Sequence, residues 1–431
     1  MKNFYYLCTR FVNRLIVYFY FLIIRIAALL GHKKARLLVR GQKETISKLK
    51  SQIANLNSPI WFHAASVGEF EQARPIIERL KANGEKRPII VTFFSPSGYE
   101  ARKGYDKADG VYYLPFATRR NAKRFLDALQ PSMAIFVKYE FWPAYLRELK
   151  KRNIPTYSIC SIFRPKQFFF RWWGKAHLNL LRCFTHIFVQ DEASRALLAQ
   201  HGITNTSVAG DTRFDRMAAV KETADAHRLT PIAQFAQGCE QVIVAGSTWP
   251  KDEILLAQYI RSIQESGFSS QTKLILVPHE LDEKHLHFIF NLFQGRMVKY
   301  SAVSAMNDPV SRQNILQHAK VLLVDTMGLL SSIYRFGQAA YIGGGLGVGI
   351  HNTIEAAAYG MPVVFGPNYH HFREAQGLID AGAARSIKNY NELAAALTTA
   401  LEQHEYLSTK AAEYVQSELG ATEKIYKYIF S

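Results

Sequence analysis

Two glutamates follow apolar segments that are typical of β-strands, and each could act as a general base. Glu69 follows the apolar run 60–64 in HAASVGEF, and Glu140 follows the run 133–137 in VKYEFWP. In parallel α/β sheets ligands bind beyond the carboxyl ends of strands, so a carboxylate at either place could take a proton from a bound hydroxyl. Each has a structural alternative, because Glu69 can complement a positive helix end and Glu140 can pair with a neighbouring Arg or Lys.

The position of Pro75 bears on where Glu69 lies. A helix is expected after the turn 66–68, with its inward positions at Phe70, Ala73, Ile76, Ile77 and Leu80. Proline cannot donate the backbone hydrogen bond that a helix interior requires. We therefore expect the regular helix to begin only just before Pro75, with Glu69 at or before its first turn.

A glycine-rich segment in the second half of the chain is suited to an anion. The run AAYIGGGLGVGIHNTIEAAAYG predicts a strand, a turn with five glycines between 343 and 349, and a short helix from about Asn352. Such glycines would expose backbone amides beside a helix amino terminus. No register fits GxGxxG before a helix, and GxxxxGK[ST] is missing, so a phosphate of another kind is indicated. The structural alternatives are a tight turn and, for Asn352 and Glu355, a capping box.

Three further segments end expected strands in the same half. Ser247 and Thr248 precede Pro250 in an N-cap pattern, and N-caps can also bind anions. The other two strand ends carry Pro278 with His279 and Met327 with Gly328. Each segment alone is more simply structural. Together with the glycine-rich turn they predict four strand ends that converge on one cleft.

Strand-like and helix-like segments alternate along the chain in two sets, separated by the polar stretch 218–241. This βαβ alternation predicts an α/β protein of two doubly wound domains with parallel sheets. The expected strands of the first set are IWFHA, PIIVTFF, VYYLPF, MAIFVKY, PTYSICSIF and HIFVQ, and those of the second are VIVAGS, KLILVP, VLLVD, AAYIGGG and PVVFG.

Composition narrows the function classes. A length of 431 residues with 48% hydrophobic content favours two domains, and the net charge of +18 points to anionic partners. The four cysteines form no CxxC pair, and the histidines lack the HExxH spacing of a zinc site. No recognition helix, RNP motif or zinc finger indicates nucleic-acid binding. We therefore expect no metal, no other cofactor and no nucleic-acid partner.

The amino-terminal segment 15–30 is apolar apart from Arg25 and is flanked by basic residues. It is slightly short for a membrane span, and it lacks the cleavage site of a signal peptide. We expect a single membrane anchor that either spans or lies in the interface, with the rest of the chain on the cytoplasmic side. The alternative is an ordinary buried helix.

Seven motifs stand in a fixed order: HAASVGE, YEFWP, GDTRFD, AGST, VPHE, DTMG and GIHNTIEAAAYGMPVVFGPNYHHF. With them nearly the whole chain resembles the bacterial 3-deoxy-D-manno-oct-2-ulosonic acid (Kdo) transferases of lipopolysaccharide biosynthesis. These are sugar-nucleotide glycosyltransferases of the GT-B type, with two Rossmann-like domains facing a cleft. The combination of HAASVGE with HNxxEAAxxGxPVxFGP is highly specific.

The resemblance implies an inverting transfer of Kdo from CMP-Kdo to a lipid A precursor of the lipid IVA type, at an inner membrane rich in anionic lipids. It implies that Glu69 is the general base and Glu140 a second carboxylate on the acceptor side. The implied nucleotide contacts are Pro278, His279, Met327, Gly328, Leu329, Asn352, Thr353, Ile354 and Glu355, with Glu355 binding the ribose. Ser247 and Thr248 join them as expected nucleotide contacts because of their N-cap pattern.

Three residues depart from the family pattern, which often has Arg for His279, Glu for Leu329 and Gly for Ile350. The expected parts are an anchor and basic linker (1–50), an acceptor-binding domain (51–215), and a nucleotide-sugar domain that includes the C-terminal helix (216–431). Two alternatives stay open. One is another GT-B transferase or an epimerase acting on a UDP-sugar, and the other is a membrane-attached anion- or nucleic-acid-binding protein without catalysis.

Overall fold

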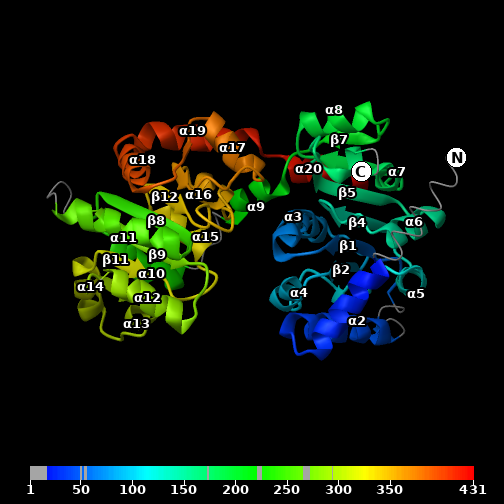
Figure 1. Ribbon diagram of the computed structural model, residues 1–431, viewed down its shortest axis with the longest axis horizontal. Helices are drawn as coiled ribbons and strands as arrows, with labels where there is room; N and C mark the ends of the chain where they lie inside the picture. The colour runs from blue at the N-terminus through cyan, green and yellow to red at the C-terminus, as the bar shows by residue number, and fades with distance from the viewer. Residues whose placement is uncertain are drawn as a thin grey trace. The chain divides into compact units, whose positions relative to one another are not determined.

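The computed structural model describes residues 17–48, 51–52, 56–171, 174–220, 226–265, 272–293 and 295–431. The chain forms two compact units (Figure 1). The first contains the described residues up to Arg216 together with Leu419–Ser431, and the second contains Met217–Glu418.

The first unit is built on a seven-stranded sheet whose strands are all parallel, in the order β3-β2-β1-β4-β5-β6-β7. The chain leaves β1 toward one edge and returns at β4 toward the other, so these two strands flank the topological switch point. The strands are β1 (Ile60–Ala64), β2 (Ile89–Phe93), β3 (Gly110–Tyr113), β4 (Met133–Val137), β5 (Thr156–Ser161), β6 (His186–Val189) and β7 (Thr206–Val208).

Both faces of this sheet are buried, which explains its strongly apolar strands. Successive side chains of a strand point to opposite faces. Accordingly Trp61 belongs to a core cluster that includes Phe125 and Leu146, whereas Phe62 belongs to a cluster that includes Ile76. His63 shares the face of Trp61 by this alternation, which places it on the side of the helices α5 (Arg119–Leu129) and α6 (Pro143–Lys151).

The helices of the first unit lie around the sheet (Figure 1). Their bounds are α2 (Lys33–Lys48), α3 (Val67–Ala82), α4 (Pro96–Arg102), α5 (Arg119–Leu129), α6 (Pro143–Lys151), the 3₁₀ turn η2 (Phe168–Phe170), α7 (Lys175–Leu181), α8 (Glu192–Gln200) and α20 (Ala421–Phe430). Helix α9 (Thr212–Val220) contains the boundary between the two units.

The expected start of the helix after Glu69 was wrong. Helix α3 begins at Val67, with Ser66 as its N-cap, and Pro75 lies inside it. Proline removes one backbone hydrogen bond. The cap at Ser66 and the complete burial of the inward face, which includes Phe70 and Ile77, offset that loss.

The C-terminal helix was expected in the second unit, but α20 packs against α3 in the first. Ile425 joins the core beside β1, and the Tyr428 hydroxyl lies 2.9 Å from His186 Nδ1. Asp215 also accepts hydrogen bonds of 2.7 Å from the backbone N–H groups of Gly420 and Thr422. The amphipathic pattern of α20 indicated a helix but not the surface that buries its apolar side.

The second unit has its own seven-stranded parallel sheet, in the order β10-β11-β9-β8-β12-β13-β14. Its switch point lies between β8 and β12. The strands are β8 (Gln241–Thr248), β9 (Thr272–Pro278), β10 (Met297–Lys299), β11 (Val321–Leu323), β12 (Ala339–Ile342), β13 (Val363–Phe365) and β14 (Ala384–Ser386).

Sequence patterns missed β7, β10 and β14, each of three residues and each at a sheet edge. The helices of the second unit are α10 (Ala226–Ala236), α11 (Pro250–Glu265), α12 (Glu283–Phe293), α13 (Tyr300–Ser304), α14 (Pro309–His318), α15 (Leu330–Ile333), η4 (Tyr334–Phe336), α16 (Ile354–Ala358), α17 (Arg373–Asp380), α18 (Tyr390–Glu402) and α19 (His404–Ser417).

The amino-terminal part differs from the expected anchor and linker. Helix α2 packs on β3, with Gln42 and Thr45 buried, so it is part of the first unit. The apolar segment is helical over 17–29, and Phe21 packs on Phe116 with ring centroids 3.9 Å apart. Within the described residues, no helix combines the length and the apolar character needed for a membrane crossing. Residues 15 and 16 lie outside the described ranges.

Candidate active site

Glu69 and Glu140 both lie at the switch point of the first unit, after the neighbouring strands β1 and β4. Glu69 is the third residue of α3, and its N–H is 3.4 Å from the Ser66 hydroxyl. Its carboxylate turns back and accepts a 2.5 Å hydrogen bond from the Ala65 N–H. The turn and the helix start therefore hold the carboxylate at the carboxyl end of β1.

Burial and the nearby carboxylate of Glu140 raise the pKa of Glu69 to about 7. The hydrogen bond from Ala65 and the electrostatic interactions with His63 and Lys138 lower this pKa, but they are weaker. A carboxylate with a pKa near neutrality is a better proton acceptor than an ordinary surface glutamate, which makes Glu69 suitable as a general base.

Glu140 is held by two side chains that belong to the first unit. Its Oε2 accepts a 2.6 Å hydrogen bond from Trp142 Nε1 and lies 3.0 Å from His63 Nε2. The side chain of His63 is 0% exposed and that of Glu140 is 13% exposed. Trp142 Nε1 also lies 3.1 Å from His63 Nε2, and the contact between His63 and Glu140 is a hydrogen bond in the tautomer that carries a hydrogen on Nε2.

The other ring nitrogen of His63 is also engaged. Nδ1 lies 2.9 Å from the Thr92 hydroxyl, which in turn accepts a 2.8 Å hydrogen bond from Trp61 Nε1. A buried chain of polar groups thus runs from Trp61 to Glu140 and fixes the imidazole. Sequence reasoning missed His63, although a histidine inside the apolar strand IWFHA, two residues after a tryptophan, was a usable signal.

In the second unit the four predicted segments lie at the carboxyl ends of β8, β9, β11 and β12, which are adjacent in one parallel sheet. Their carboxyl ends therefore share one edge, as the sequence predicted. The backbone N–H of His279 donates a 3.0 Å hydrogen bond to the Thr248 carbonyl, which joins the ends of β9 and β8.

The glycine-rich turn does not present its amides as expected. The N–H groups of glycines 343, 347 and 349 donate to backbone carbonyls, and Gly344 N–H donates to Asp252 at 2.8 Å. A Cβ at Gly343 would lie 2.3 Å from the Ser247 carbonyl oxygen, and one at Gly345 would lie 2.6 Å from the Gly366 nitrogen. These glycines allow the turn to pack against neighbouring strand ends, and a ligand is not needed to explain them.

Asp252 accepts hydrogen bonds that hold the glycine-rich turn in place, and the sequence did not indicate this role. It is fully buried and accepts hydrogen bonds from Tyr341 Oη at 2.7 Å, Gly344 N–H at 2.8 Å and Trp249 N–H at 2.9 Å. An acidic residue in the first turn after Pro250 was a common helix-start pattern, so nothing in the sequence pointed to the glycine-rich turn as its partner.

The N-cap prediction for Ser247 and Thr248 was wrong. Both belong to β8, and Thr248 is fully buried with its hydroxyl donating to Glu253 at 2.9 Å. Glu253 is also buried, and its other oxygen lies 2.8 Å from His285 Nε2. The Thr248 hydroxyl therefore forms a hydrogen bond in the protein interior and does not cap a helix. The start of α11 at Pro250 was predicted correctly.

His279 is exposed and belongs to a stack of three rings. Its ring centroid lies 5.0 Å from that of Trp249 and 4.3 Å from that of His351. His351 Nε2 accepts a 3.2 Å hydrogen bond from Trp249 Nε1. Burial and the nearby His279 lower the pKa of His351 to about 4, so its ring is neutral near pH 7. Trp249 and His351 were not among the predicted site residues.

The remaining predicted nucleotide contacts divide by exposure. Met327 and Gly328 are exposed, and Asn352 and Glu355 are partly exposed. The other four side chains are buried and offer no contact surface for a ligand: Pro278, Leu329, Thr353 and Ile354. The departure at Ile350 is also a packing feature, since that side chain is 3% exposed.

Asn352 and Glu355 form a helix-capping interaction, which was the structural alternative to nucleotide binding. Asn352 Oδ1 accepts a 3.1 Å hydrogen bond from Ile354 N–H, and its amide donates to Glu355 at 2.9 Å. This capping arrangement begins α16 two residues later than expected. A ligand at this place would have to bind groups that already hold each other.

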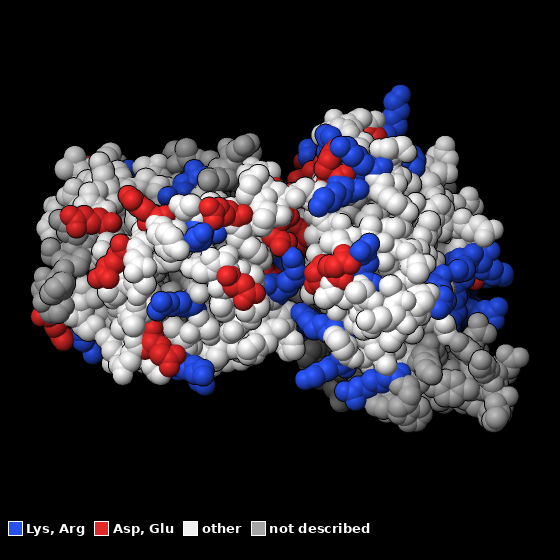
Figure 2. Space-filling model, turned by 90° about the horizontal axis from the view of Figure 1, so that it is seen from above, with Lys and Arg blue, Asp and Glu red and all other residues white. Residues whose placement is uncertain are grey.

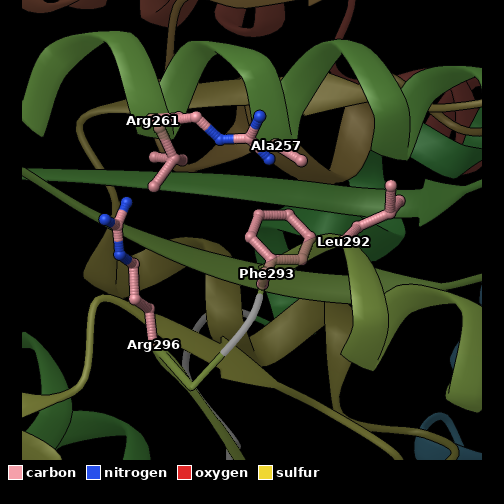
Figure 3. A pocket seen from close by; sticks show the side chains of 6 residues that line it. Ala257, Arg261, Leu292, Phe293 and Arg296 are labelled. Carbon is pink, nitrogen blue, oxygen red and sulfur yellow. The ribbon is translucent and has the colours of Figure 1, made fainter. Parts of the chain in front are cut away.

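A small cavity of about 80 Å³ lies between α11 and α12, away from these strand ends (Figure 3). It is lined by Ala257, Ile260, Arg261, Leu292, Phe293 and Arg296. None of them is a predicted site residue. The cavity is far smaller than the roughly 300 Å³ at which ligand pockets begin, so it does not mark a nucleotide site.

Comparison with known proteins agrees with the resemblance. Residues 34–216 match the family model described as 3-deoxy-D-manno-octulosonic-acid transferase (kdotransferase). A curated transferase of that name from Rickettsia bellii is 25% identical over 97% of this chain and 96% of its own length. Another, from Aquifex aeolicus, is 25% identical over 82% of this chain and 88% of its own length.

Among solved structures, a UDP-GlcNAc 2-epimerase from Neisseria meningitidis superposes with a TM-score of 0.61 over 86% of this chain and 98% of its own. At 15% identity this likeness concerns the fold alone. It agrees with two parallel-sheet α/β units of the GT-B kind. The matches in sequence run from the first unit through the second, and over most of its length the chain is similar to 3-deoxy-D-manno-octulosonic acid transferases.

Proposed function

We propose that this protein is an inverting glycosyltransferase that moves Kdo from CMP-Kdo to a lipid A precursor of the lipid IVA type, in lipopolysaccharide biosynthesis. The sequence similarity to 3-deoxy-D-manno-octulosonic acid transferases supports the reaction class. The observation that carries the mechanism is the Glu69 carboxylate, held at the carboxyl end of β1 with its pKa raised to about 7.

In this mechanism Glu69 takes the proton from a hydroxyl of the acceptor sugar. The oxygen then attacks the anomeric carbon of Kdo, while the bond to the cytidine monophosphate breaks on the opposite face, which inverts the configuration. Glu140 is a second carboxylate for the acceptor, and His63 and Trp142 fix its position. Its charge also raises the pKa of Glu69, so the two glutamates have different tasks.

The strand ends of the second unit are proposed to bind the nucleotide. The predicted residues whose side chains have accessible surface there are Ser247, His279, Met327, Asn352 and Glu355. His279 can donate a hydrogen bond to a phosphate oxygen and so stabilise the charge that develops on the leaving group. In this proposal no metal ion takes part, because backbone dipoles and imidazole donors take that role.

We also propose that the protein works at the cytoplasmic face of the inner membrane, attached by its amino-terminal segment. Eight apolar side chains between residues 18 and 30 are 46% to 83% exposed, namely Tyr18, Phe19, Tyr20, Leu22, Ile23, Ile26, Leu29 and Leu30. A helix with such a surface can lie in the interface of a bilayer. The net charge of +18 favours contact with anionic lipids.

The test is mass analysis of the products after incubation with CMP-Kdo and the lipid A precursor. We expect the acceptor mass to rise by one Kdo residue or more, and no product with UDP-activated sugars. Product with a UDP-sugar and none with CMP-Kdo would overturn the proposal in favour of another GT-B enzyme. The Glu69→Gln variant serves as the matched inactive control.

A further inference from the structure

A large basic pocket lies in the first unit, apart from the carboxylate pair. It has a volume of about 1040 Å³ and is bounded by the start of the described amino-terminal helix, by α5 and by α6. This volume is at the upper end of the range for small-molecule sites, and it suits the headgroup of a glycolipid. None of the residues predicted from the sequence belongs to it.

The wall of this pocket is strongly cationic. Six basic residues contribute to it, namely Arg119, Arg120, Lys123, Arg147, Lys150 and Lys151. The one carboxylate in the wall, Glu148, is paired with Arg152 at 2.9 Å. Arginine and lysine side chains in this number select anions, and arginine matches phosphate geometry well. On the face of the first unit seen in Figure 2, Lys and Arg side chains gather densely at one edge.

The placement of two of these arginines opposes helix stability. Arg119 and Arg120 form the start of α5, whose first turn has no acidic residue. Positive charges at a helix amino terminus are unfavourable because that end of the helix dipole is itself positive. Residues that break a local stability rule are expected at functional sites. Here the positive charges and the dipole point to the same ligand, an anion.

Two neighbours of the pocket indicate what kind of anion it takes. Val17 and Tyr18 line it, and they are the first described residues of the helix whose outer face exposes Phe19, Leu22 and Ile23. On another side, the lining residue Pro143 directly follows Trp142, the residue that holds Glu140. An apolar surface on one side and the carboxylate pair on another fit an amphiphile whose sugar reaches Glu69.

We propose that this basic pocket binds the phosphate groups of the lipid acceptor and so positions the sugar hydroxyl at Glu69. The inference rests on the proposed function for the identity of the acceptor. It goes beyond that function by assigning a phosphate-binding site to α5 and α6. A phosphorylated glycolipid is the occupant, and a bilayer surface without it is an outcome of the test.

The test uses the full chain and sedimentation with phosphatidylcholine vesicles that contain either the phosphorylated lipid A precursor or the same lipid after phosphatase treatment. The variant is Arg119→Gln/Arg120→Gln, which keeps long polar side chains at two exposed positions of α5. The control is Lys86→Gln/Lys107→Gln, which makes the same change in charge. These two lysines lie in loops that precede β2 and β3, at the amino ends of the strands, whereas Arg119 and Arg120 follow the carboxyl end of β3.

We expect the arginine variant to bind the phosphorylated lipid about tenfold more weakly or worse, and the lysine control to bind it like the unchanged protein. Dephosphorylated lipid should bind weakly to all three proteins, with little further loss from the arginine changes. This non-additivity is the expected signature of arginine–phosphate contacts. Equal losses for both lipids, or equal losses in the variant and the control, would overturn the proposal.

A third vesicle, in which phosphatidylglycerol supplies the same charge density, separates the pocket from general membrane attraction. Equal weakening of the arginine variant on these vesicles would assign the charges to the bilayer and contradict a specific site. Because binding is measured without CMP-Kdo, failure of Kdo transfer and failure of this inference are distinguishable. Circular dichroism of both variants confirms that α5 is folded.

Discussion

The two units place different chemistry at the same topological position. In the first unit the switch point between β1 and β4 carries Glu69 and Glu140, and burial together with the nearby charge of Glu140 raises the pKa of Glu69 to about 7. In the second unit the switch point between β8 and β12 carries packed glycines and stacked imidazoles. The site in the first unit is suited to removing a proton, and the site in the second unit is suited to binding an anion.

Each site also contains a histidine, buried at His63 and partly buried at His351, and the partners differ. His63 faces Glu140, whereas His351 faces Trp249 and His279. The carboxylate favours a hydrogen on His63 Nε2, while burial beside another imidazole keeps His351 neutral near pH 7. The fold places both histidines near the switch point of a sheet, and the neighbouring side chains determine what each imidazole contacts.

The largest effect is expected from Glu69→Gln. The amide keeps the shape of the side chain but cannot accept the proton, so the turnover number should fall by about 10³-fold. Binding of CMP to the second unit should stay unchanged, as measured by calorimetry. A Gln variant with near-normal turnover would remove Glu69 as the base.

The second unit should be most sensitive at Asp252. Asp252→Ala leaves three buried donors without their acceptor, and we expect a loss of about 2 to 4 kcal/mol in the free energy of unfolding. Tyr341→Phe removes one of these three contacts and should cost about 1 kcal/mol. Urea unfolding of both variants measures the difference. Equal and small losses would show that Asp252 does not hold the glycine-rich turn.

A smaller effect concerns stability and pH. Because folding raises the pKa of Glu69 from 4.5 to about 7, the folded protein binds this proton more tightly than the unfolded chain does. The contribution of Glu69 to stability therefore falls as pH rises from about 4.5 to 7. Above pH 7 Glu69→Gln should be more stable than the unchanged protein, by about 1 to 2 kcal/mol after allowance for partial exposure.

That pH effect is checked by thermal melts across the range, with Glu423→Gln on the exposed face of α20 as the control. The control should shift little with pH, since its ion pair with Arg79 is 42% exposed on both sides. A parallel pH dependence in Glu69→Gln and the unchanged protein would contradict the raised pKa.

Much of the framework could be predicted from the sequence. Apolar runs of β-branched residues identified eleven strands, and the residues after them led to Glu69, Glu140 and His279. The predictions that were wrong or missing concern features that depend on packing between segments far apart in the sequence. The start of α3, the partner of α20 and the role of Asp252 are decided by contacts between segments that no local pattern reports.

The glycine-rich turn shows the same limit. Five glycines in seven positions suggested exposed amides, yet Gly343 and Gly345 are required where backbone meets backbone. The same residue type serves close approach to a ligand or to the protein itself. Spacing cannot distinguish these cases, whereas Glu69 was identifiable because a carboxylate has few uses at a strand end.

The most direct test of the account is the pH dependence of the turnover number for Kdo transfer, at saturating CMP-Kdo and acceptor, in the unchanged protein and in Glu140→Gln. The account predicts that turnover rises with pH through an inflection near 7, and that the inflection moves to lower pH when the Glu140 charge is removed. An inflection that is the same in both proteins, or one near the 4.5 of an ordinary glutamate in the unchanged protein, would contradict it.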